Sequence, residues 1–503
     1  MRPHLILLHP PSHLDYRERK LRHSLASATI ATSPLFEYYP LGFLALMEYL
    51  GRYNLDVRII NLAVKMAKSA RFDPRRLIRK LKPMIFGIDL HWMVHANGAL
   101  DLARICKEEH PEIPVVLGGL TSSYFHREII ESPHVDYVLR GDSTEQPMVD
   151  LLRALESKRE PAEVANLTWK RNGEAVVNPL TYQPDLLDIK IDYRRLIKHM
   201  LRYRDLRGGL LTGLQWPVYA FNMTLSCRGC THTCLTCGGS NWALGRNALA
   251  VRNPEALAEE IISIQQLTTS PVGIVGDIRQ HEPDRLIAAL KQRKPTRPLS
   301  FELFGTGGED FLGKLAGIGP PLDIHMSPES HDERLRARYG RPFSNEQLES
   351  DIEFALGIGG KALLFFVIGI PGQTRESVAQ SVAYSGQLLE RYNSRYPKKL
   401  DVMFSPLLPF IDPGSPAFEN PEKTGYRLFA HTLAEHRGLL RKPDLRHALN
   451  YETDALTRAD IIDVGAEAME KTADIREQCG LLAGKWAEQE RAKYREARND
   501  AAE

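Results

Sequence analysis

Four cysteines stand close together in the segment CRGCTHTCLTCGG, residues 227–239. In a reducing compartment, thiols at this spacing more often bind metal than form disulfides. Cys227, Cys230, Cys234 and Cys237 could form two C-x2-C pairs around zinc, but structural zinc sites usually separate such pairs by about a dozen residues or more. The last three cysteines alone form a C-x3-C-x2-C pattern. Three thiolates can hold three irons of a [4Fe–4S] cluster and leave the fourth iron open to a ligand.

The composition of the chain excludes several classes of partner. Its 503 residues include 65 Lys and Arg against 63 Asp and Glu, so the net charge of +2 gives no field that would attract nucleic acid or an anionic membrane. The longest apolar run, residues 362–370, is too short for a membrane span of ~20 residues, and residues 1–11 lack the apolar core of a signal peptide. We therefore expect a cytoplasmic protein with no nucleic-acid or membrane partner. Cys106 and Cys479 are expected to be packing residues.

The first part of the chain alternates short apolar strands with helical patterns five times. The strands are expected at 5–9, 56–63, 84–92, 114–119 and 135–142. Apolar strands alternating with helices predict an α/β, doubly wound (Rossmann-like) parallel sheet, whose ligand lies beyond the C-terminal ends of the strands. We place this domain at 1–160 and a linker with small strands at 161–215. The basic stretch in that linker is interpreted as a solvated face.

A second series of six strand-helix units follows the linker. Six units predict a partial (β/α)6 barrel at 216–412, although periodicity alone does not separate a barrel from an open sheet. The cysteine segment follows the first of these strands, so it lies at the face where barrels carry their chemistry. Residues 413–503 are expected to form a helical C-terminal region.

The C-x3-C-x2-C spacing after the first strand of such a barrel resembles the radical S-adenosylmethionine (SAM) superfamily. In that family the amino and carboxylate groups of SAM bind the open iron. The resemblance implies a [4Fe–4S] cluster on Cys230, Cys234 and Cys237. Thr236 departs from the family, which often has an aromatic residue there. Cys227 lies outside the motif and is interpreted as a small residue packed beside the cluster.

SAM contacts are expected at the ends of three further barrel strands. The second strand ends where family members often have Gly-Gly-Glu, the fourth ends in Ser-Pro-Glu-Ser, and the fifth resembles the family's G-x-I-x-G region. The resemblance implies that the SAM-binding residues are Gly276, Asp277, Ser327, Glu329, Ile368 and Gly369. Two alternatives stay open, because the Ser-Pro-Glu-Ser loop could simply cap the next helix and Gly and Pro are ordinary turn residues.

A doubly wound domain placed before such a barrel resembles the cobalamin-binding class of radical SAM proteins. The phrases GIDLHW, VVLGGLTSS and RGDSTEQP, after the third, fourth and fifth strands, carry this resemblance. Paired glycines let a backbone approach a large flat ligand. By resemblance the cobalamin-binding residues are Asp89, His91, Trp92, Gly118, Gly119, Leu120, Thr121 and Gly141.

One motif of many cobalamin domains is missing. Those domains carry D-x-H-x-x-G after the first strand, and its histidine ligates cobalt, whereas this chain has LLHPPSHLD there. His91 is interpreted as a hydrogen-bonding loop residue, and Trp92 as a cover for the lower face of the corrin. Cobalt would then have no histidine ligand.

The resemblance favours a cobalamin-dependent radical SAM enzyme that methylates an unactivated carbon. In that family a reduced cluster cleaves SAM to a 5′-deoxyadenosyl radical, which abstracts hydrogen before methylcobalamin delivers the methyl group. It further implies a small-molecule or natural-product substrate and an external one-electron reductant. Residues 404–429 and 449–453 are expected to form a lid or substrate wall. Cyclisation or rearrangement, a radical SAM enzyme without a corrin, and a zinc-binding protein remain alternatives.

Overall fold

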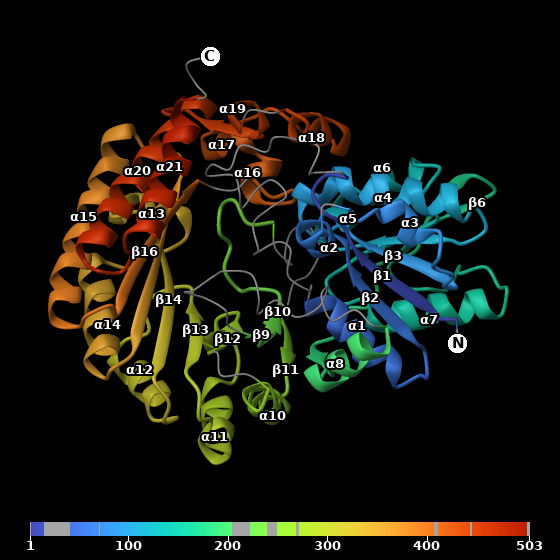
Figure 1. The fold of residues 1–503 in the computed structure, drawn as a ribbon, viewed down its shortest axis with the longest axis horizontal. Helices are drawn as coiled ribbons and strands as arrows, with labels where there is room; N and C mark the ends of the chain where they lie inside the picture. Colours follow the sequence, from blue (N-terminus) through green and yellow to red (C-terminus); the bar gives the residue numbers. More distant parts are fainter. Residues whose placement is uncertain are drawn as a thin grey trace.

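The computed structural model describes residues 2–14, 41–69, 71–203, 222–238, 249–267, 271–406, 411–442 and 445–499. Two large sheets stand beside each other, one in an N-terminal domain and one in a barrel-like domain, and the C-terminal helices lie against both (Figure 1). The predicted α/β fold class is confirmed. None of the helices among the described residues is long and apolar enough to cross a membrane.

The N-terminal sheet has the strand order β2-β1-β3-β4-β5-β6-β7. Its first five strands are parallel and buried, as their apolar sequences predict. The order reverses at β1, which pairs with β2 on one side and β3 on the other. The strands are β1 (Leu5–His9), β2 (Val57–Asn61), β3 (Ile85–Asp89), β4 (Val115–Gly118), β5 (Tyr137–Leu139), β6 (Leu167–Arg171) and β7 (Glu174–Val177).

Helices cover both faces of this sheet (Figure 1). Their apolar stripes face the strands, and one cluster of buried hydrophobic side chains continues from this domain into the barrel and the C-terminal region. The helices are α1 (Leu41–Gly51), α2 (Leu62–Lys68), α3 (Pro74–Ile78), the 3-10 helix η3 (Met93–His95), α4 (Ala96–Glu109), α5 (Leu120–Tyr124), α6 (His126–Glu131) and α7 (Glu145–Glu156). Cys106 on α4 is fully buried, as expected.

The segment predicted as a linker is partly integrated into the N-terminal domain. Strands β6 and β7 extend the first sheet by antiparallel pairing, because the free edge of β5 accepts them and Trp169 becomes buried there. The basic stretch contributes to α8 (Tyr193–Arg202), which is tied to the same domain by the ion pairs Arg195–Glu48 (2.9 Å) and Arg202–Asp56 (3.1 Å). It is thus a partly paired face rather than only a solvated one.

The second large sheet has six parallel strands in the order β16-β15-β14-β13-β12-β9. Each strand follows its predecessor in space, which matches the predicted partial barrel. The strands are β9 (Asn222–Leu225), β12 (Val272–Val275), β13 (Leu299–Leu303), β14 (Leu322–Glu329), β15 (Lys361–Ile368) and β16 (Leu400–Pro406). The intervening helices are α10 (Pro254–Gln265), η5 (Ile278–Gln280), α11 (Pro283–Arg293), α12 (Glu309–Ala316), α13 (Glu333–Tyr339), α14 (Asn345–Gly357) and α15 (Arg375–Arg395).

Short strands supplement the two large sheets. β8 (Leu186–Leu187), β10 (Cys227–Arg228) and β11 (Ala250–Arg252) form a small sheet that joins the linker to the cysteine segment. The C-terminal region, expected to be helical, also contains the antiparallel pair β17 (Tyr426–Leu428) and β18 (Tyr451–Thr453). Its helices are α16 (Pro416–Glu419), α17 (Pro421–Thr424), α18 (Leu433–Leu440), α19 (Leu445–Ala448), α20 (Arg458–Gln478) and α21 (Lys485–Asn499).

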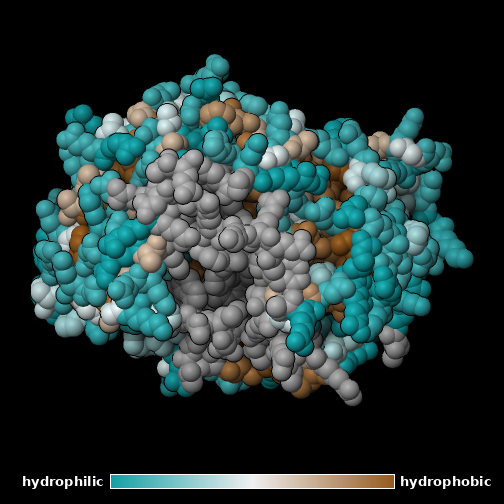
Figure 2. All heavy atoms as spheres, turned by 45° about the horizontal axis from the view of Figure 1, so that its top comes forward, coloured by the Kyte–Doolittle hydropathy of each residue, from teal (hydrophilic) through white to brown (hydrophobic). Residues whose placement is uncertain are grey.

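The C-terminal region contacts both domains. Helices α16 to α19 lie between the barrel and the N-terminal domain at the top of Figure 1, and α20 packs on α15 and β16. Asn97 on α4 exchanges hydrogen bonds of 3.1 Å with the side chain and the carbonyl oxygen of Arg437 on α18. In the view of Figure 2 the described surface is mostly hydrophilic, with small apolar areas between the polar side chains.

Candidate active site

The cysteine segment is a loop held in place by other elements. It begins with β10, shortly after β9, so it lies at the C-terminal end of the first barrel strand. The backbone N–H and hydroxyl of Thr231 donate to Gln280 Oε1 (2.6 and 2.9 Å). Thr236 shares a hydrogen bond of 2.6 Å with Tyr339, and the Gly238 N–H donates to Asp412 Oδ2 (3.1 Å). These bonds come from η5, from α13 and from the segment before α16, so three separate parts of the chain hold the loop.

The three cysteines of the motif differ from Cys227 in exposure. Cys230 and Cys234 are half-buried and Cys237 is exposed, whereas Cys227 is buried. Burial raises the pKa of the Cys230 and Cys234 thiols, and the positive charge of Arg341 acts in the opposite direction. Burial raises the pKa of Cys227 to about 11. Cys227 therefore stays a neutral thiol at neutral pH, as its predicted packing role requires.

Gly276, directly after β12, has little room for a side chain. Its φ is +89°, and a β-carbon there would lie 3.0 Å from Ser226 Oγ and 3.3 Å from Cys227 Sγ. Its N–H donates to Glu302 Oε2 (3.0 Å) at the end of β13. Burial raises the pKa of Glu302. Sequence reasoning missed this carboxylate, although Glu302 interrupts an otherwise apolar strand end.

Asp277, one of the residues expected to contact SAM, is held by protein partners. Its buried carboxylate pairs with the guanidinium of Arg279 (2.5 Å) and accepts a hydrogen bond from the Phe304 N–H (2.8 Å). Those contacts lock the turn after β12, because Arg279 lies only two residues further along the chain. The structure thus gives Asp277 protein partners at the position where a SAM contact was expected.

The end of β14 carries an irregular backbone. The register with β15 shifts between Met326 and Glu329, and Glu329 has φ +64°. A non-glycine residue in that region is uncommon and costs of order 1–3 kcal/mol. The buried Arg336 holds the loop through hydrogen bonds to the carbonyl oxygens of Pro328 (3.1 Å) and Ser330 (2.8 Å). Ser327 is half-buried beside this bend.

Glu329 and Arg341 form a buried charged pair near the cysteine loop. Glu329 Oε1 lies 3.7 Å from Arg341 Nε, and both side chains are less than a tenth exposed. Burial raises the pKa of Glu329 to about 7, although Arg341 opposes the shift. Among the described residues, Arg341 Nε is buried without a hydrogen-bond partner. A buried donor of this kind is costly unless a ligand accepts its hydrogen bond.

The end of β15 is held by one amide side chain. Gln373 Oε1 accepts hydrogen bonds from the Gly369 N–H (2.9 Å) and the Ile370 N–H (3.0 Å), and its Nε2 donates to the Val367 carbonyl (2.9 Å). Gly369 has φ +99°, and a β-carbon there would lie 2.8 Å from the hydroxyl oxygen of Tyr451 on β18. Ile368 is fully buried.

Three loops of the N-terminal domain are bound to one another at the C-terminal ends of β3, β4 and β5. Gly119 has φ +116°, and a β-carbon there would lie 2.6 Å from His91 Cα. The hydroxyl of Thr121 donates to the His91 carbonyl (2.9 Å), and the Gly141 N–H donates to Ser123 Oγ (2.9 Å). Gly118 and Leu120 flank Gly119 in the same loop.

Trp92 is the exposed member of the predicted corrin residues. It is 42% exposed, and its ring contacts that of His91 edge to face at a centroid distance of 4.8 Å. Large exposed aromatic side chains at a strand-end loop are suited to cover a flat ligand.

A buried ion pair joins the cysteine loop to the N-terminal domain. Arg228 Nη2 lies 2.7 Å from Glu145 Oε1, with side chains 8% and 5% exposed. Arg228 Nη1 also donates to Ser143 Oγ (3.2 Å) in the loop after β5. The C-terminal ends of both sheets therefore meet at this pair, which brings the predicted cluster loop next to the predicted corrin loops.

Family models identify both domains. The B12 binding domain model matches residues 28–149, and the radical SAM superfamily model matches residues 224–384. The second match includes the cysteine loop, four of the six barrel strands and the end of β9.

The chain is a radical SAM protein with a B12-binding domain.

Relatives and a solved structure agree with this assignment. An uncharacterized methyltransferase of Pyrococcus horikoshii is 24% identical over 354 residues, which cover 69% of this chain and 73% of the relative. The hopanoid C-3 methylase of Methylococcus capsulatus is 24% identical over 242 residues, 48% of this chain and 43% of that enzyme. The radical SAM methyltransferase TsrM of Kitasatospora setae, with cobalamin and a [4Fe–4S] cluster bound, superposes with a TM-score of 0.63 at 15% identity over 100% of both chains. That similarity shows that the radical SAM protein shares the TsrM fold.

The B12-binding domain also contains a cluster of three buried polar side chains that was not predicted from the sequence. His9, Asp89 and His95 are all buried, and His9 Nδ1 lies 3.0 Å from Asp89 Oδ2. Burial would raise the pKa of Asp89, but the hydrogen bond and charge of His9 outweigh it and hold the pKa below its usual range. Burial lowers the pKa of His95 to about 3, so this imidazole is neutral at physiological pH. Asp89 was predicted to contact the corrin, yet its carboxylate points to His9.

Proposed function

We propose that this radical SAM protein is a cobalamin-dependent methyltransferase that acts on an unactivated carbon of a small molecule. One observation carries the proposal. A C-x3-C-x2-C loop at the end of the first strand of a six-stranded parallel barrel is joined, through Arg228 and Glu145, to the C-terminal strand ends of a B12-binding domain. In doubly wound sheets and in barrels alike, ligands bind at those ends. The names of two relatives, both methyl-transferring enzymes, support the direction of the chemistry.

The donor set of the loop fits a [4Fe–4S] cluster. Cys230, Cys234 and Cys237 would bind three irons through thiolates, and the half-buried loop keeps the cluster near solvent-excluded strand ends. Burial raises the pKa of Cys230 and Cys234, and the positive charge of Arg341 opposes that shift and so assists their ionisation on binding iron. A closed structural zinc site takes four ligands, whereas the C-x3-C-x2-C motif supplies three and Cys227, outside it, is buried.

The strand ends next to the loop fit a zwitterion with a ribose and a base. We assign the SAM contacts to Gly276, Ser327 and Glu329, and to the backbone at Ile368 and Gly369. Arg341 joins them, because its buried Nε lacks a hydrogen-bond partner among the described residues and suits a carboxylate. Glu302 replaces Asp277 in this assignment, because Asp277 is bound to Arg279 and Glu302 lies beside Gly276.

The loops after β3, β4 and β5 fit a corrin. Gly119 leaves no volume for a side chain next to His91, and Thr121 and Ser123 fix neighbouring loops, so the three backbones form one firm surface. Trp92 stands exposed at its edge. We assign His91, Trp92, Gly118, Gly119, Leu120, Thr121 and Gly141 to this site. Asp89 is left out, because its carboxylate belongs to the buried group with His9.

The protein's own residues would bind the cofactors, orient the reacting atoms and shield them from water. When bound, the cluster and SAM supply one-electron chemistry at the substrate carbon, and cobalamin supplies the methyl group. Residues at the two facing sets of strand ends would hold the reacting atoms in line, which removes much of the entropic barrier. Two residues of the C-terminal region would help exclude water, because Asp412 contacts the cysteine loop and Tyr451 covers Gly369 at the end of β15. An external reductant would supply electrons from outside the chain.

The test begins with anaerobic reconstitution. We expect a brown protein with ~4 Fe per chain and one bound cobalamin, which releases 5′-deoxyadenosine from SAM when reduced. Cys230→Ala should lose the iron and the SAM cleavage, whereas Cys227→Ser should retain both. Isotope-labelled SAM should pass its methyl group to cobalamin, and mass analysis of candidate substrates should show the gain of one methylene unit. A colourless protein with one zinc per chain, or a brown protein that binds no cobalamin, would contradict the proposal.

A further inference from the structure

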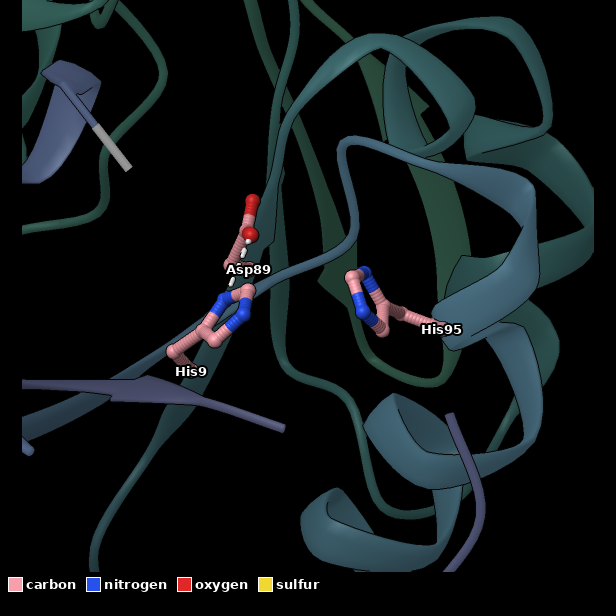
Figure 3. Close-up of side chains that lie close together, drawn as sticks. All are labelled: His9, Asp89 and His95. Carbon is pink, nitrogen blue, oxygen red and sulfur yellow. Dashed lines mark hydrogen bonds and ion pairs between the residues drawn. The ribbon is translucent and has the colours of Figure 1, made fainter. Parts of the chain in front are cut away.

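The buried group His9, Asp89 and His95 has the composition of a metal site. Among the described residues, these three offer ligand atoms that all lie within 4.8 Å of one another, and all three side chains are buried. Figure 3 shows the Asp89 carboxylate bonded to His9, with the imidazole of His95 beside them. The ring centroids of His9 and His95 are 5.0 Å apart. Nothing in the radical SAM chemistry proposed above uses these residues.

The backbone fixes all three positions. His9 is the last residue of β1 and Asp89 the last residue of β3, and these strands pair in parallel up to Leu8 and Ile88. The two side chains therefore stand side by side at the carboxyl ends of neighbouring strands. His95 ends the short helix η3, which follows β3 directly. The group lies where the strand order reverses, between β1 and β3, which is the position at which doubly wound sheets bind ligands.

Two imidazoles and one carboxylate are the ligands that divalent transition metals of intermediate softness prefer. At metal–donor distances of about 2.0–2.2 Å, donors around a tetrahedral ion stand roughly 3.4 Å apart. The ligand atoms of His9, Asp89 and His95 lie within 4.8 Å of one another, so rotation of the side chains can bring them to that spacing. The Asp89 carboxylate is already oriented, because its Oδ1 accepts a hydrogen bond of 3.1 Å from the His91 N–H.

We propose that His9, Asp89 and His95 bind one divalent transition-metal ion of the zinc type, separate from the iron–sulfur cluster and from cobalamin. The ion would connect β1, β3 and η3, and water would complete its coordination. It would thereby fix the start of the loop that carries His91 and Trp92. The proposal is independent of the methyltransferase function, because it needs neither SAM nor a corrin.

The test uses the full chain with Cys230, Cys234 and Cys237 all changed to Ala, so that the accessible thiols of the loop do not compete for the ion. Corrin-free, chelator-treated protein is titrated with Zn²⁺ by calorimetry and with Co²⁺ by absorption. We expect one ion per chain and a rise in the unfolding temperature on binding. His95→Gln and Asp89→Asn should weaken the affinity by at least about 100-fold. The matched control is His110→Gln, which removes another buried histidine of the same domain that bonds to the Ile78 carbonyl.

Two outcomes would overturn the proposal. One is that the chain with Cys230, Cys234 and Cys237 changed to Ala binds neither Zn²⁺ nor Co²⁺ stoichiometrically. The other is equal affinity in that chain with and without His95→Gln, which would place the ion elsewhere. If His95→Gln fails to fold, X-ray absorption is measured on the Co²⁺-bound chain that retains His9 and His95. Two imidazole ligands on the ion support the site, and fewer reject it. Because SAM cleavage and corrin content are not measured, a negative result here leaves the methyltransferase proposal unaffected.

Discussion

The ion pair between Arg228 and Glu145 makes the sharpest quantitative prediction about how the two domains are joined. Both groups are more than nine-tenths buried and lie 2.7 Å apart. Removing one partner of a buried pair leaves an uncompensated charge and costs about 3–5 kcal/mol. Glu145→Gln should therefore lower the free energy needed to open the contact between the cysteine loop and α7 by that amount. Because each ~1.4 kcal/mol is a factor of ten, local opening should rise by more than about 100-fold.

Hydrogen exchange followed by mass spectrometry measures that opening directly in the segments around residues 222–238 and 142–150. It needs no assumption that the whole chain unfolds in one step. The matched control is Glu255→Gln, which removes the exposed pair with Arg285, 43% and 49% exposed, and should change exchange by less than about 1 kcal/mol. A double change of Arg228 and Glu145 to Met should recover most of the loss. If Glu145→Gln accelerates exchange no more than the control does, the pair does not hold the domains together and our reasoning is wrong.

Three further predictions concern the cofactor sites. Cys230→Ala should abolish the ~4 Fe per chain whereas Cys227→Ala should keep them, as iron analysis after reconstitution will show; equal loss from both would contradict the assignment of ligands. Gly119→Ala should lose bound cobalamin, because its β-carbon would lie 2.6 Å from the backbone after β3, whereas Gly42→Ala on α1, whose β-carbon would meet no heavy atom of the described residues within 4 Å, should retain it on gel filtration. Between pH 4.5 and about 7, the free energy of unfolding of the cluster-free wild type should fall by up to about 3 kcal/mol relative to that of Glu329→Gln. Burial raises the pKa of Glu329 from 4.5 to about 7 in the folded state, so ionisation of Glu329 in this range disfavours the folded state. Chemical unfolding at several pH values checks this, and parallel stability profiles would refute it.

The strand ends could be predicted from the sequence because they depend on local patterns. The apolar run at residues 5–9 is β1 to the residue, and the segment 323–330 overlaps β14 almost completely. The cysteine loop was placed correctly for the same reason, since it directly follows an apolar strand. Antiparallel edge strands were harder: β6 and β7 read as isolated pieces of a linker, because their partner β5 lies almost thirty residues earlier.

Groups assembled across the sheet could not be predicted. His9 and Asp89 are 80 residues apart and meet only through the register of β1 and β3. Arg341 reaches Glu329 because a helix and a turn intervene between them. Asp277 shows the opposite case, because its partner Arg279 is only two residues away in the chain and the sequence pattern still did not indicate the pair.

The contacts of the C-terminal region bear on the order in which the protein can be assembled in a cell. Asp412 closes the cysteine loop, Tyr451 covers Gly369 and Arg437 bonds to Asn97 on α4. Domains fold from the N-terminus as the ribosome releases them, so the B12-binding domain and most of the barrel emerge before any of these residues do. Until then the cysteine loop lacks one of its anchors and the strand ends lie open. Iron and sulfide would therefore reach the loop most easily before the C-terminal region docks.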